Sequence, residues 1–192
     1  MRRFESAQVA EAAALLRAGG VLAYPTEAVF GLGCDPDNRA AFENIFLLKQ
    51  RPPEQGVLLI ASDFSQIADW IEAPPEAIAR AQATWPGAYT WIFPRSPRVP
   101  EWVAGGHSGI ALRVTAHESA AALCRAFGGP IVSTSANRHG EPPARSAEEV
   151  QAMFGSGSSA GALLQGVLHG ATGGLTRPTP IADAVTGAII RA

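Results

Sequence analysis

Apolar residues form two kinds of run along the chain, and the two kinds alternate. Short unbroken apolar runs predict buried strands at 21–24, 57–61, 88–93, 110–114 and 130–134. Longer stretches with an apolar residue every three or four positions predict helices at 7–18, 39–50, 117–127 and 146–154, with two short helices near 63–71 and 75–84. Weak strands are expected at 163–168, 181–185 and 188–191. The alternation predicts an α/β fold with a mixed sheet.

The ends of several predicted helices carry sequence signals. Ser6 can cap the first helix, Asp37 or Asn38 the second, and Ser146 with Glu149 forms a capping box. The Gly/Ser stretch 155–161 is expected to be a linker or a loop tip. Because the residues after it are too few to fold alone, residues 1–192 are expected to form a single domain.

The composition is that of an ordinary globular protein. Of the 192 residues, 47% are hydrophobic and 17% are charged, and the formal net charge of −2 points to neither a nucleic-acid nor a membrane partner. Glu5 and Glu11 interrupt the apolar N-terminal stretch, which argues against a secretory signal, and no apolar run reaches membrane-spanning length. Cys34 and Cys124 give neither a disulfide framework nor a zinc site. A soluble cytoplasmic protein is therefore expected.

Arginine supplies almost all of the positive charge. Lys49 is the only lysine among the fifteen basic residues. This indicates either a position that needs a compact ammonium group or a biased codon composition, and the sequence leaves both open. Between Ala77 and His117 arginines outnumber acids, which suggests a locally positive cleft, although scattered arginines on a solvated face are the simpler explanation.

Familiar nucleotide and hydrolase motifs are missing from the sequence. There is no G-x-x-x-x-G-K-[ST] loop and no G-x-S-x-G elbow, and the stretch GLGCDP lacks the third glycine of a dinucleotide loop. The four histidines show no ligand spacing with cysteines or carboxylates, so no metal-binding residues are expected.

Two polar clusters follow predicted apolar elements in the first third of the chain. In the first, Thr26 and Glu27 come after a strand and two glycines follow, although a glycine-rich turn explains this stretch when it is taken alone. In the second, Lys49 and Arg51 can converge on a polyanion such as a triphosphate if the helix ends near Gln50. Taken alone, capping of the helix C-terminus by positive charge is the simpler explanation.

A third cluster follows the predicted strand at 130–134. Ser133, Ser135 and Asn137 alternate, so an extended strand end would place all three on one side, where ligands of α/β sheets bind. Hydroxyls and an amide can bind phosphate oxygens or a ribose, whereas a turn that caps its own backbone explains one or two of these residues more easily than three. Arg113, on another predicted strand, is a candidate to hold a carboxylate.

Together these stretches make the sequence resemble the YrdC/TsaC family, the single-domain bacterial threonylcarbamoyl-AMP synthases. The resemblance rests on YPTEAVFGLGCDP, LKQRP, WPGAYT, ALRVTAH, STSAN and TGG, which occur in the family order from about Tyr24 to Gly174. Each stretch is weak alone, but the ordered set is highly specific. The resemblance implies a YrdC-like twisted open mixed sheet flanked by helices, with a concave and positively charged central cavity.

The resemblance also implies an activity. L-Threonine, bicarbonate and ATP would give L-threonylcarbamoyladenylate, pyrophosphate and water, which makes the protein a nucleotidyltransferase with Mg²⁺ accompanying ATP. The product would supply the threonylcarbamoyl modification of the tRNA adenosine next to the anticodon. The implied partners are therefore the three substrates, the proteins of the downstream tRNA threonylcarbamoyl-transfer complex and tRNA itself as a further candidate, with no membrane.

The family motifs can be carried over residue by residue. A Lys-x-Arg pair and a Ser-x-Asn pair line the ATP site of the family and are taken as catalytic, and a late arginine lies near the nucleotide; these fall on Lys49, Arg51, Ser135, Asn137 and Arg191. The residues implied for threonine are Thr26, Arg113, Ser133 and Thr179. No residue stands out as a general base.

The sequence departs from the family pattern in three places. His139 stands where a serine is common, Gln55 where a lysine or asparagine is common, and Thr179-Pro180 replaces Ser-Thr, with Arg177 as a candidate compensation. The Pro/Gly-rich stretch after Thr172 is a candidate lid.

Two other functions are compatible with the same residues. One is a double-stranded RNA-binding, tRNA-binding or ribosome-maturation factor without catalysis. The other is the carbamoyl-adenylate chemistry of hydrogenase-maturation carbamoyltransferases, which carry extra domains and zinc motifs that this sequence lacks.

Overall fold

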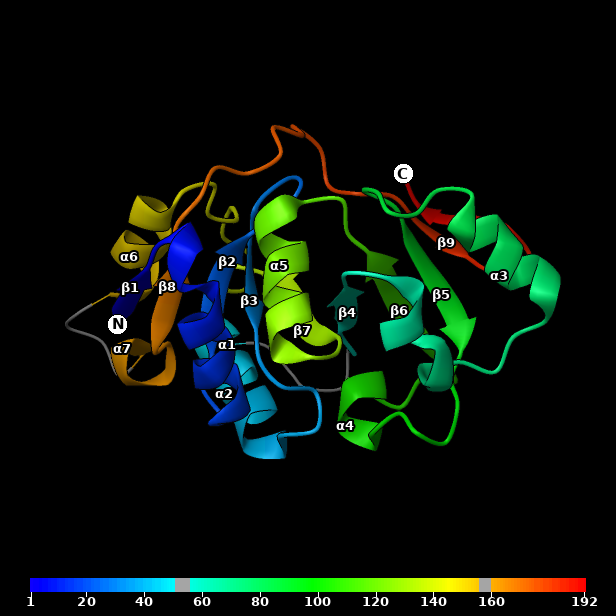
Figure 1. The fold of residues 1–192 in the computed structure, drawn as a ribbon, viewed down its shortest axis with the longest axis horizontal. Coiled ribbons are helices and arrows are strands. Elements are labelled where there is room, and N and C mark those ends of the chain that lie inside the picture. The colour runs from blue at the N-terminus through cyan, green and yellow to red at the C-terminus, as the bar shows by residue number, and fades with distance from the viewer. Residues whose placement is uncertain (51–55, 156–159) are drawn as a thin grey trace.

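The computed structural model describes residues 1–50, 56–155 and 160–192, and within them ten strands form one mixed sheet (Figure 1). The strands are β1 (Arg2–Phe4), β2 (Leu22–Pro25), β3 (Phe30–Gly33), β4 (Leu58–Ala61), β5 (Thr90–Pro94), β6 (Gly109–Val114), β7 (Ile131–Ser135), β8 (Gly166–Leu168), β9 (Ile181–Asp183) and β10 (Ile189–Arg191). Their order across the sheet is β1-β8-β2-β3-β7-β4-β6-β5-β9-β10.

Parallel and antiparallel neighbours are combined in this sheet. The pairs β1–β8, β2–β8, β4–β6 and β5–β9 are parallel, and the other neighbouring pairs are antiparallel. The α/β class with a mixed sheet that the apolar pattern predicted is therefore confirmed. The charge of the cavity implied by the resemblance stays a prediction.

Helices cover both faces of the sheet. They are α1 (Val9–Arg17), α2 (Arg39–Lys49), α3 (Pro75–Gln82), α4 (Glu101–Ala104), α5 (Glu118–Phe127), α6 (Ala147–Phe154) and α7 (Ala160–Leu163). Among the described residues, none of these helices combines the length and apolar character that a membrane crossing needs.

The period-two alternation of strand side chains divides the core into two layers. On one face, α1 and α5 lie side by side and pack against side chains such as Leu22, Ile60 and Ile131 (Figure 1). On the other face, a larger cluster joins the helices α2, α3, α4 and α6 to side chains such as Leu59 and Val132. Adjacent strand residues such as Leu59 and Ile60 thus belong to different layers.

Two strands occur where the sequence did not predict them. β3 lies in the stretch expected to be a glycine-rich turn, and it forms an antiparallel hairpin with β2. Glycine has low β-propensity, but here Gly33 makes room for its neighbours: a Cβ atom there would lie 2.6 Å from the Val132 carbonyl oxygen and 2.7 Å from the Tyr24 ring. β1 was missed because it has only three residues and pairs with the distant β8.

The predicted helices are found with small differences. Asn38 caps α2 by accepting a hydrogen bond from the Ala41 amide, and Gly128 ends α5 in the left-handed region. Ser6, expected to cap the first helix, instead begins a 3-10 turn that is capped by Glu5. The helix predicted at 63–71 is two short 3-10 turns. The short α4 was not predicted, and residues 156–159 of the predicted linker lie outside the described residues.

Residues 169–180, called the crossover segment below, join strands that lie far apart in the sheet. This segment has no helix or strand and runs from β8, next to β1, to β9, next to β10 (Figure 1). It is tied to the loop after β2, because the amides of Gly173 and Leu175 donate to the carbonyl oxygens of Thr26 (3.0 Å) and Glu27 (3.1 Å). The segment therefore passes directly over the end of β2.

Candidate functional site

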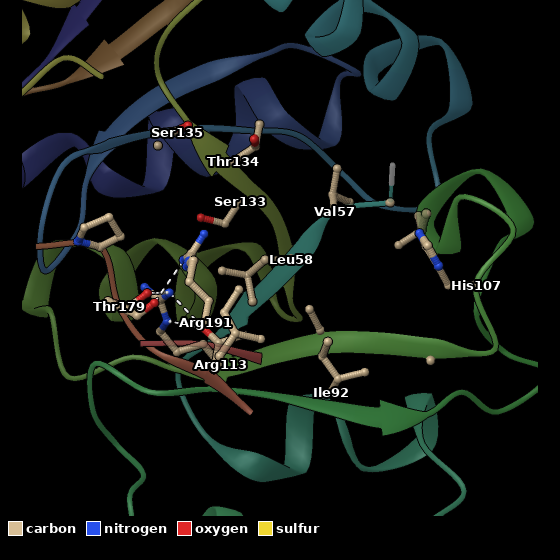
Figure 2. Close-up of a pocket in the computed structure, with 18 of the residues that line it drawn as sticks. Val57, Leu58, Ile92, His107, Arg113, Ser133, Thr134, Ser135, Thr179 and Arg191 are labelled. Atoms are coloured by element: carbon tan, nitrogen blue, oxygen red, sulfur yellow. Dashed lines mark hydrogen bonds between the residues drawn. The ribbon is translucent and has the colours of Figure 1, made fainter. Parts of the chain in front are cut away.

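A cavity of about 800 Å³ lies on the sheet face that α1 and α5 share (Figure 2). Leu58 of β4 lines the cavity, whereas Ile60, two residues further along the same strand, packs against the α1 and α5 layer. Because alternate residues of a strand share a face, the cavity is the part of this face that the two helices leave uncovered.

The floor of the cavity is a row of residues in register across five strands. Ser133, Leu58, Ala111, Ile92 and Asp183 are successive partners on β7, β4, β6, β5 and β9, and all of them line the cavity. The centre of the row is apolar, and polar side chains lie at both ends. The cavity is thus built by the sheet, with loops supplying its walls.

The two ends of the cavity differ in character. At one end, Arg113, Thr179 and Arg191 gather near Ser133, and at the other His107 lies beside Val57 (Figure 2). The end with the two arginines, called the polar end below, suits a carboxylate or a phosphate. The end with Val57 and His107 suits a flat or aliphatic group.

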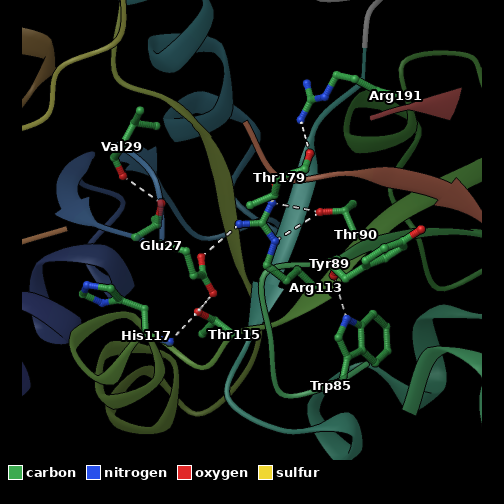
Figure 3. Close-up of polar contacts among 11 residues, drawn as sticks. Glu27, Val29, Trp85, Tyr89, Thr90, Arg113, Thr115, His117, Thr179 and Arg191 are labelled. Carbon is green, nitrogen blue, oxygen red and sulfur yellow. Dashed lines mark hydrogen bonds and ion pairs between the residues drawn. The ribbon is translucent and has the colours of Figure 1, made fainter. Parts of the chain in front are cut away.

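Arg113 of β6 is the buried charged group at the polar end. Its side chain is buried, with 5% of the residue exposed, yet it reaches the cavity. Nε and Nη2 donate to the Thr90 hydroxyl at 3.1 and 2.9 Å, Nη2 also donates to the Thr179 hydroxyl, and Nη1 donates to Glu27 Oε2 at 3.1 Å (Figure 3). The guanidinium is therefore fixed by one carboxylate and two hydroxyls.

Burial perturbs the ionisable groups of this end. It lowers the pKa of Arg113, and the charge of Glu27 opposes that effect. Since arginine starts from so high a pKa, Arg113 remains charged. Burial raises the pKa of the Tyr24 phenol, against a hydrogen bond with Ser133, so that this phenol stays neutral in the core beside Ser133.

Sequence reasoning named Glu27 but gave it no role, and it did not consider Thr90 or Thr115. Glu27 is 6% exposed, and its second oxygen accepts a hydrogen bond from the Thr115 hydroxyl at 2.5 Å. That hydroxyl accepts in turn from the His117 amide at the start of α5 (3.0 Å) (Figure 3). The signal for Thr90 and Thr115 was a lone hydroxyl inside or at the end of an apolar strand run, AYTWIF and ALRVTAH.

Lys49 ends α2 and is almost fully buried, at 3% exposure. Its ammonium donates to the carbonyl oxygen of Ser135, to the carbonyl oxygen of Asn137 (3.1 Å) and to the amide oxygen of Asn137 (2.9 Å), and it lies 3.5 Å from the Ser135 hydroxyl. Ser135 lines the cavity. The structure thus brings together three of the four residues predicted as catalytic.

The predicted alternation of Ser133, Ser135 and Asn137 holds only in part. β7 ends at Ser135, and the Asn137 amide bonds back to the Ser135 carbonyl at 3.0 Å, so Asn137 is not on an extended strand. It still meets Ser135, because the Ser135 hydroxyl donates to the Asn137 amide oxygen at 2.6 Å. The cluster is therefore a turn that is held by Lys49.

The remaining predicted residues are placed as follows. Thr26, Ser133, Thr179 and Arg191 line the cavity with Arg113, and Arg191 Nη2 donates to the Thr179 carbonyl oxygen at 2.9 Å. His139 and Arg177 are exposed and are not among the residues that line it. Arg51 and Gln55 lie outside the described residues.

The carboxylates near the cavity do not form a cation site. Within the part of the chain that the structure describes, no three His, Cys, Asp or Glu residues are placed to hold a metal ion. Asp183 lines the cavity, but its Oδ1 accepts from the Thr186 amide (2.7 Å) and hydroxyl (3.0 Å), while Glu27 is used by Arg113. Because the Glu27 and Asp183 oxygens already accept hydrogen bonds, these carboxylates suit a metal that arrives bound to a phosphate better than a resident ion.

Comparison with known proteins places this geometry in context. The family model for Sua5, YciO and YrdC, described as telomere recombination, matches residues 14–192. A protein named threonylcarbamoyl-AMP synthase from Stenotrophomonas maltophilia (strain K279a) is 55% identical over 183 residues, which cover 94% of this chain and 95% of that protein. One of the same name from Alkalilimnicola ehrlichii (strain ATCC BAA-1101 / DSM 17681 / MLHE-1) is 52% identical over 187 residues, with 96% and 95% covered.

A solved structure shares the fold. The crystal structure of P. abyssi Sua5 complexed with L-threonine superposes with a TM-score of 0.85 at 29% identity, and the match covers 95% of this chain and 53% of that chain. This chain thus spans about half the length of P. abyssi Sua5.

Proposed function

This chain belongs to the Sua5–YciO–YrdC family, whose model spans residues 14–192, and on that premise we propose that it is a threonylcarbamoyl-AMP synthase. The reaction joins L-threonine, bicarbonate and ATP and releases pyrophosphate and water. The observation that carries the proposal is the identity of about half of all positions with proteins of that name over nearly the whole of both chains.

The polar end of the cavity suits threonine. Arg113 offers a buried cation to the carboxylate, and the hydroxyls of Ser133 and Thr179 offer hydrogen bonds beside it. A zwitterion must also lose its ammonium proton before the amine can attack carbon dioxide or bicarbonate. We assign no base to this step, because both oxygens of the nearest buried carboxylate, Glu27, already accept hydrogen bonds.

The turn after β7 suits the triphosphate. Lys49, Ser135 and Asn137 form one hydrogen-bonded group there. Arg191, which lies beside Arg113 and Thr179 in Figure 2, is the second arginine that lines the cavity. Arg51 is proposed for the same site from the family motif. Charge develops on the α-phosphate and on leaving pyrophosphate during adenylation, and fixed cations and donors stabilise it. Mg²⁺ would come as part of the ATP substrate and add charge at the phosphates.

The main contribution of the protein is to hold the reactants together. Adenylation needs a carbamate oxygen in line with the α-phosphorus, and the rigid sheet floor sets that geometry. A walled cavity also limits the water that reaches a labile carbamate. The product would then be consumed by proteins that transfer the threonylcarbamoyl group to tRNA.

The proposal is tested by pyrophosphate release from ATP with threonine and bicarbonate each present or omitted. Release that requires both, and that is much slower with serine, is the expected result. Release that ignores threonine, from a folded protein with Mg²⁺ present, contradicts the proposal. That result would favour the alternative of an RNA-binding factor, although no contact among the described residues specifically supports RNA binding.

A further inference from the structure

Glu27, the buried ion-pair partner of Arg113 at the threonine end, has no role in the function proposed above. Both residues are at least nine-tenths buried, and Arg113 lines the cavity whereas Glu27 does not. A group that lies behind a binding residue can act only through that residue. The contacts of Arg113 therefore decide what Glu27 does.

The donors of Arg113 fall into two sets. Nη1 donates to the Glu27 carboxylate, whereas Nε and Nη2 donate to the neutral hydroxyls of Thr90 and Thr179. An incoming carboxylate competes with an acceptor that is already there. Displacing Glu27 would leave a buried carboxylate without its cation, which is costly. The hydroxyl of Thr90 or Thr179 is a weaker acceptor, and it can turn to another partner when a carboxylate replaces it.

Glu27 is itself held from two sides. Thr115 donates to the carboxylate oxygen that Arg113 does not use (Figure 3). The Glu27 backbone carbonyl accepts from the Leu175 amide in the crossover segment that carries Thr179. Its carboxylate therefore has one position, and so does the Nη1 end of Arg113. The opposite, Nη2 end is the part of the guanidinium that is presented among exchangeable hydroxyls.

We propose that Glu27 is a positioning residue for the amino-acid substrate: it pins Nη1 of Arg113, so that the Nη2 end receives the substrate carboxylate in exchange for the Thr179 hydroxyl. This inference rests on the proposed function. Threonine binding then depends on the length of the Glu27 side chain and not on its charge alone.

Two substitutions separate reach from charge. Glu27→Asp keeps the charge but shortens the side chain by one methylene, so the carboxylate cannot hold Arg113 and Thr115 in the same positions. Glu27→Gln keeps the length and an acceptor oxygen for Nη1. The expected result is a rise of about tenfold or more in the KM for threonine in Glu27→Asp and of less than about threefold in Glu27→Gln, with the KM for ATP nearly unchanged in both.

A double-mutant cycle tests whether Glu27 acts through Arg113. Lysine has no planar fork to orient, so Glu27→Asp should raise the KM for threonine little further in an Arg113→Lys background. If Glu27→Asp caused a general structural defect instead, the fold-increases in KM of the two variants would multiply. Glu43→Asp is the matched control, since Glu43 forms an exposed ion pair with Arg39 on α2 and its shortening should change neither KM. If Glu27→Asp fails to fold, Thr115→Val replaces it in the test. This variant removes the hydroxyl that donates to Glu27 and accepts from the His117 amide, and it should also raise the KM for threonine.

The outcomes keep this inference apart from the proposed function. If the wild-type protein releases no threonine-dependent pyrophosphate, the proposed function fails. If the wild type is active, the inference is overturned by a Glu27→Asp variant with an unchanged threonine KM, by equal rises in both KM values, or by full multiplication of the effects in the cycle.

Discussion

The ammonium of Lys49 lies among oxygens that converge on a small volume. Four oxygen atoms of Ser135 and Asn137, two of them backbone carbonyls, lie within 3.5 Å of Nζ. A tetrahedral ammonium can donate in three directions at such a point, whereas a guanidinium is planar and larger. The geometry thus favours the structural explanation of the single lysine in an arginine-rich sequence.

The first prediction concerns this residue. Lys49→Arg should lower the rate of pyrophosphate release about a hundredfold, because the larger group displaces the turn that carries Ser135 and Asn137. Lys49→Met should be at least as impaired. Steady-state assays beside thermal melting curves would check this, and a Lys49→Arg enzyme within about threefold of wild type would show that a compact ammonium is not needed.

The second prediction is a pH dependence at Asp183. Hydrogen bonds from Thr186 lower the pKa of the Asp183 carboxyl in the folded protein. A folded-state pKa below the unfolded value of about 3.9 means that ionised Asp183 adds stability above that pH and loses it as the pH falls through the folded-state pKa.

Asp183→Asn keeps an acceptor for the Thr186 amide but has no charge to titrate. Wild type should therefore be more stable than this variant near neutral pH, and the difference should shrink steadily once the pH falls below about 3.9. Urea unfolding of both proteins across this range gives the measurement. A difference that is independent of pH would contradict the assignment.

Among single residues, sequence reasoning found those that touch the cavity better than those behind them. Ser133 was predicted from the alternation at a strand end, Arg113 from its place on a strand, and Thr179 from the family pattern alone, and all three line the cavity. Glu27 and Thr90 act through contacts across strands, and one sequence without a fold does not reveal which distant residue lies beside which.

At the scale of elements, the hairpin of β2 and β3 depends on two glycines with different neighbours. At Gly33 an added Cβ would meet a backbone carbonyl at 2.6 Å, whereas at Gly31, on the cavity side, the nearest atom is the Ser133 hydroxyl at 3.3 Å. The third prediction is that Gly33→Ala destabilises the fold by about 1–3 kcal/mol.

Gly31→Ala should instead cost less stability but raise the KM for threonine, since its methyl group crowds Ser133. Denaturant unfolding and kinetics on the same pair of variants would test the contrast. Equal losses of stability in the two variants would argue against it.

The crossover segment is the second element with a local test. An added Cβ at Gly173 would lie 2.9 Å from the Glu27 carbonyl oxygen and 3.0 Å from its Cα, so Gly173→Ala must move the segment away from the end of β2. The fourth prediction is that this variant raises the KM for threonine severalfold with little change in melting temperature. Gly129→Ala is the control, because the nearest atom to its Cβ is 4.0 Å away. Unchanged kinetics in Gly173→Ala would show that the segment does not shape the site.

Elements with long periodic patterns were predicted from the sequence, and irregular ones were not. α2 and α5 appear close to their expected ranges because each has an apolar stripe and end signals. β3 was missed because Gly31 and Gly33 oppose a strand locally, and tertiary contacts override that preference. The path of the crossover segment has no local pattern from which it could be predicted.

For the whole molecule, the cavity links distant parts of the sheet. Its lining runs from the loop after β2 through β7, β4, β6 and β5 to β9 and β10. The fifth prediction is that substrates stabilise the entire fold, by about 2.7 kcal/mol for a ligand at one hundred times its dissociation constant.

Arg113→Lys should keep the stabilisation by ATP and lose most of that by threonine. Thermal unfolding with each ligand alone and together would measure both effects. If threonine stabilises wild type and this variant equally, Arg113 is not its carboxylate ligand.

The sheet order also has a consequence for how the protein is made. β1 is translated long before its partner β8, and Thr179, Ile181 and Arg191 follow later still. Until then the growing chain holds an open sheet face and an unpaired first strand, which are features that chaperones bind. A message cut short before β9 would therefore yield a polypeptide with most of the cavity floor but without the wall that Ile181 and Arg191 supply, so the cavity closes only after β9 and β10 have been made.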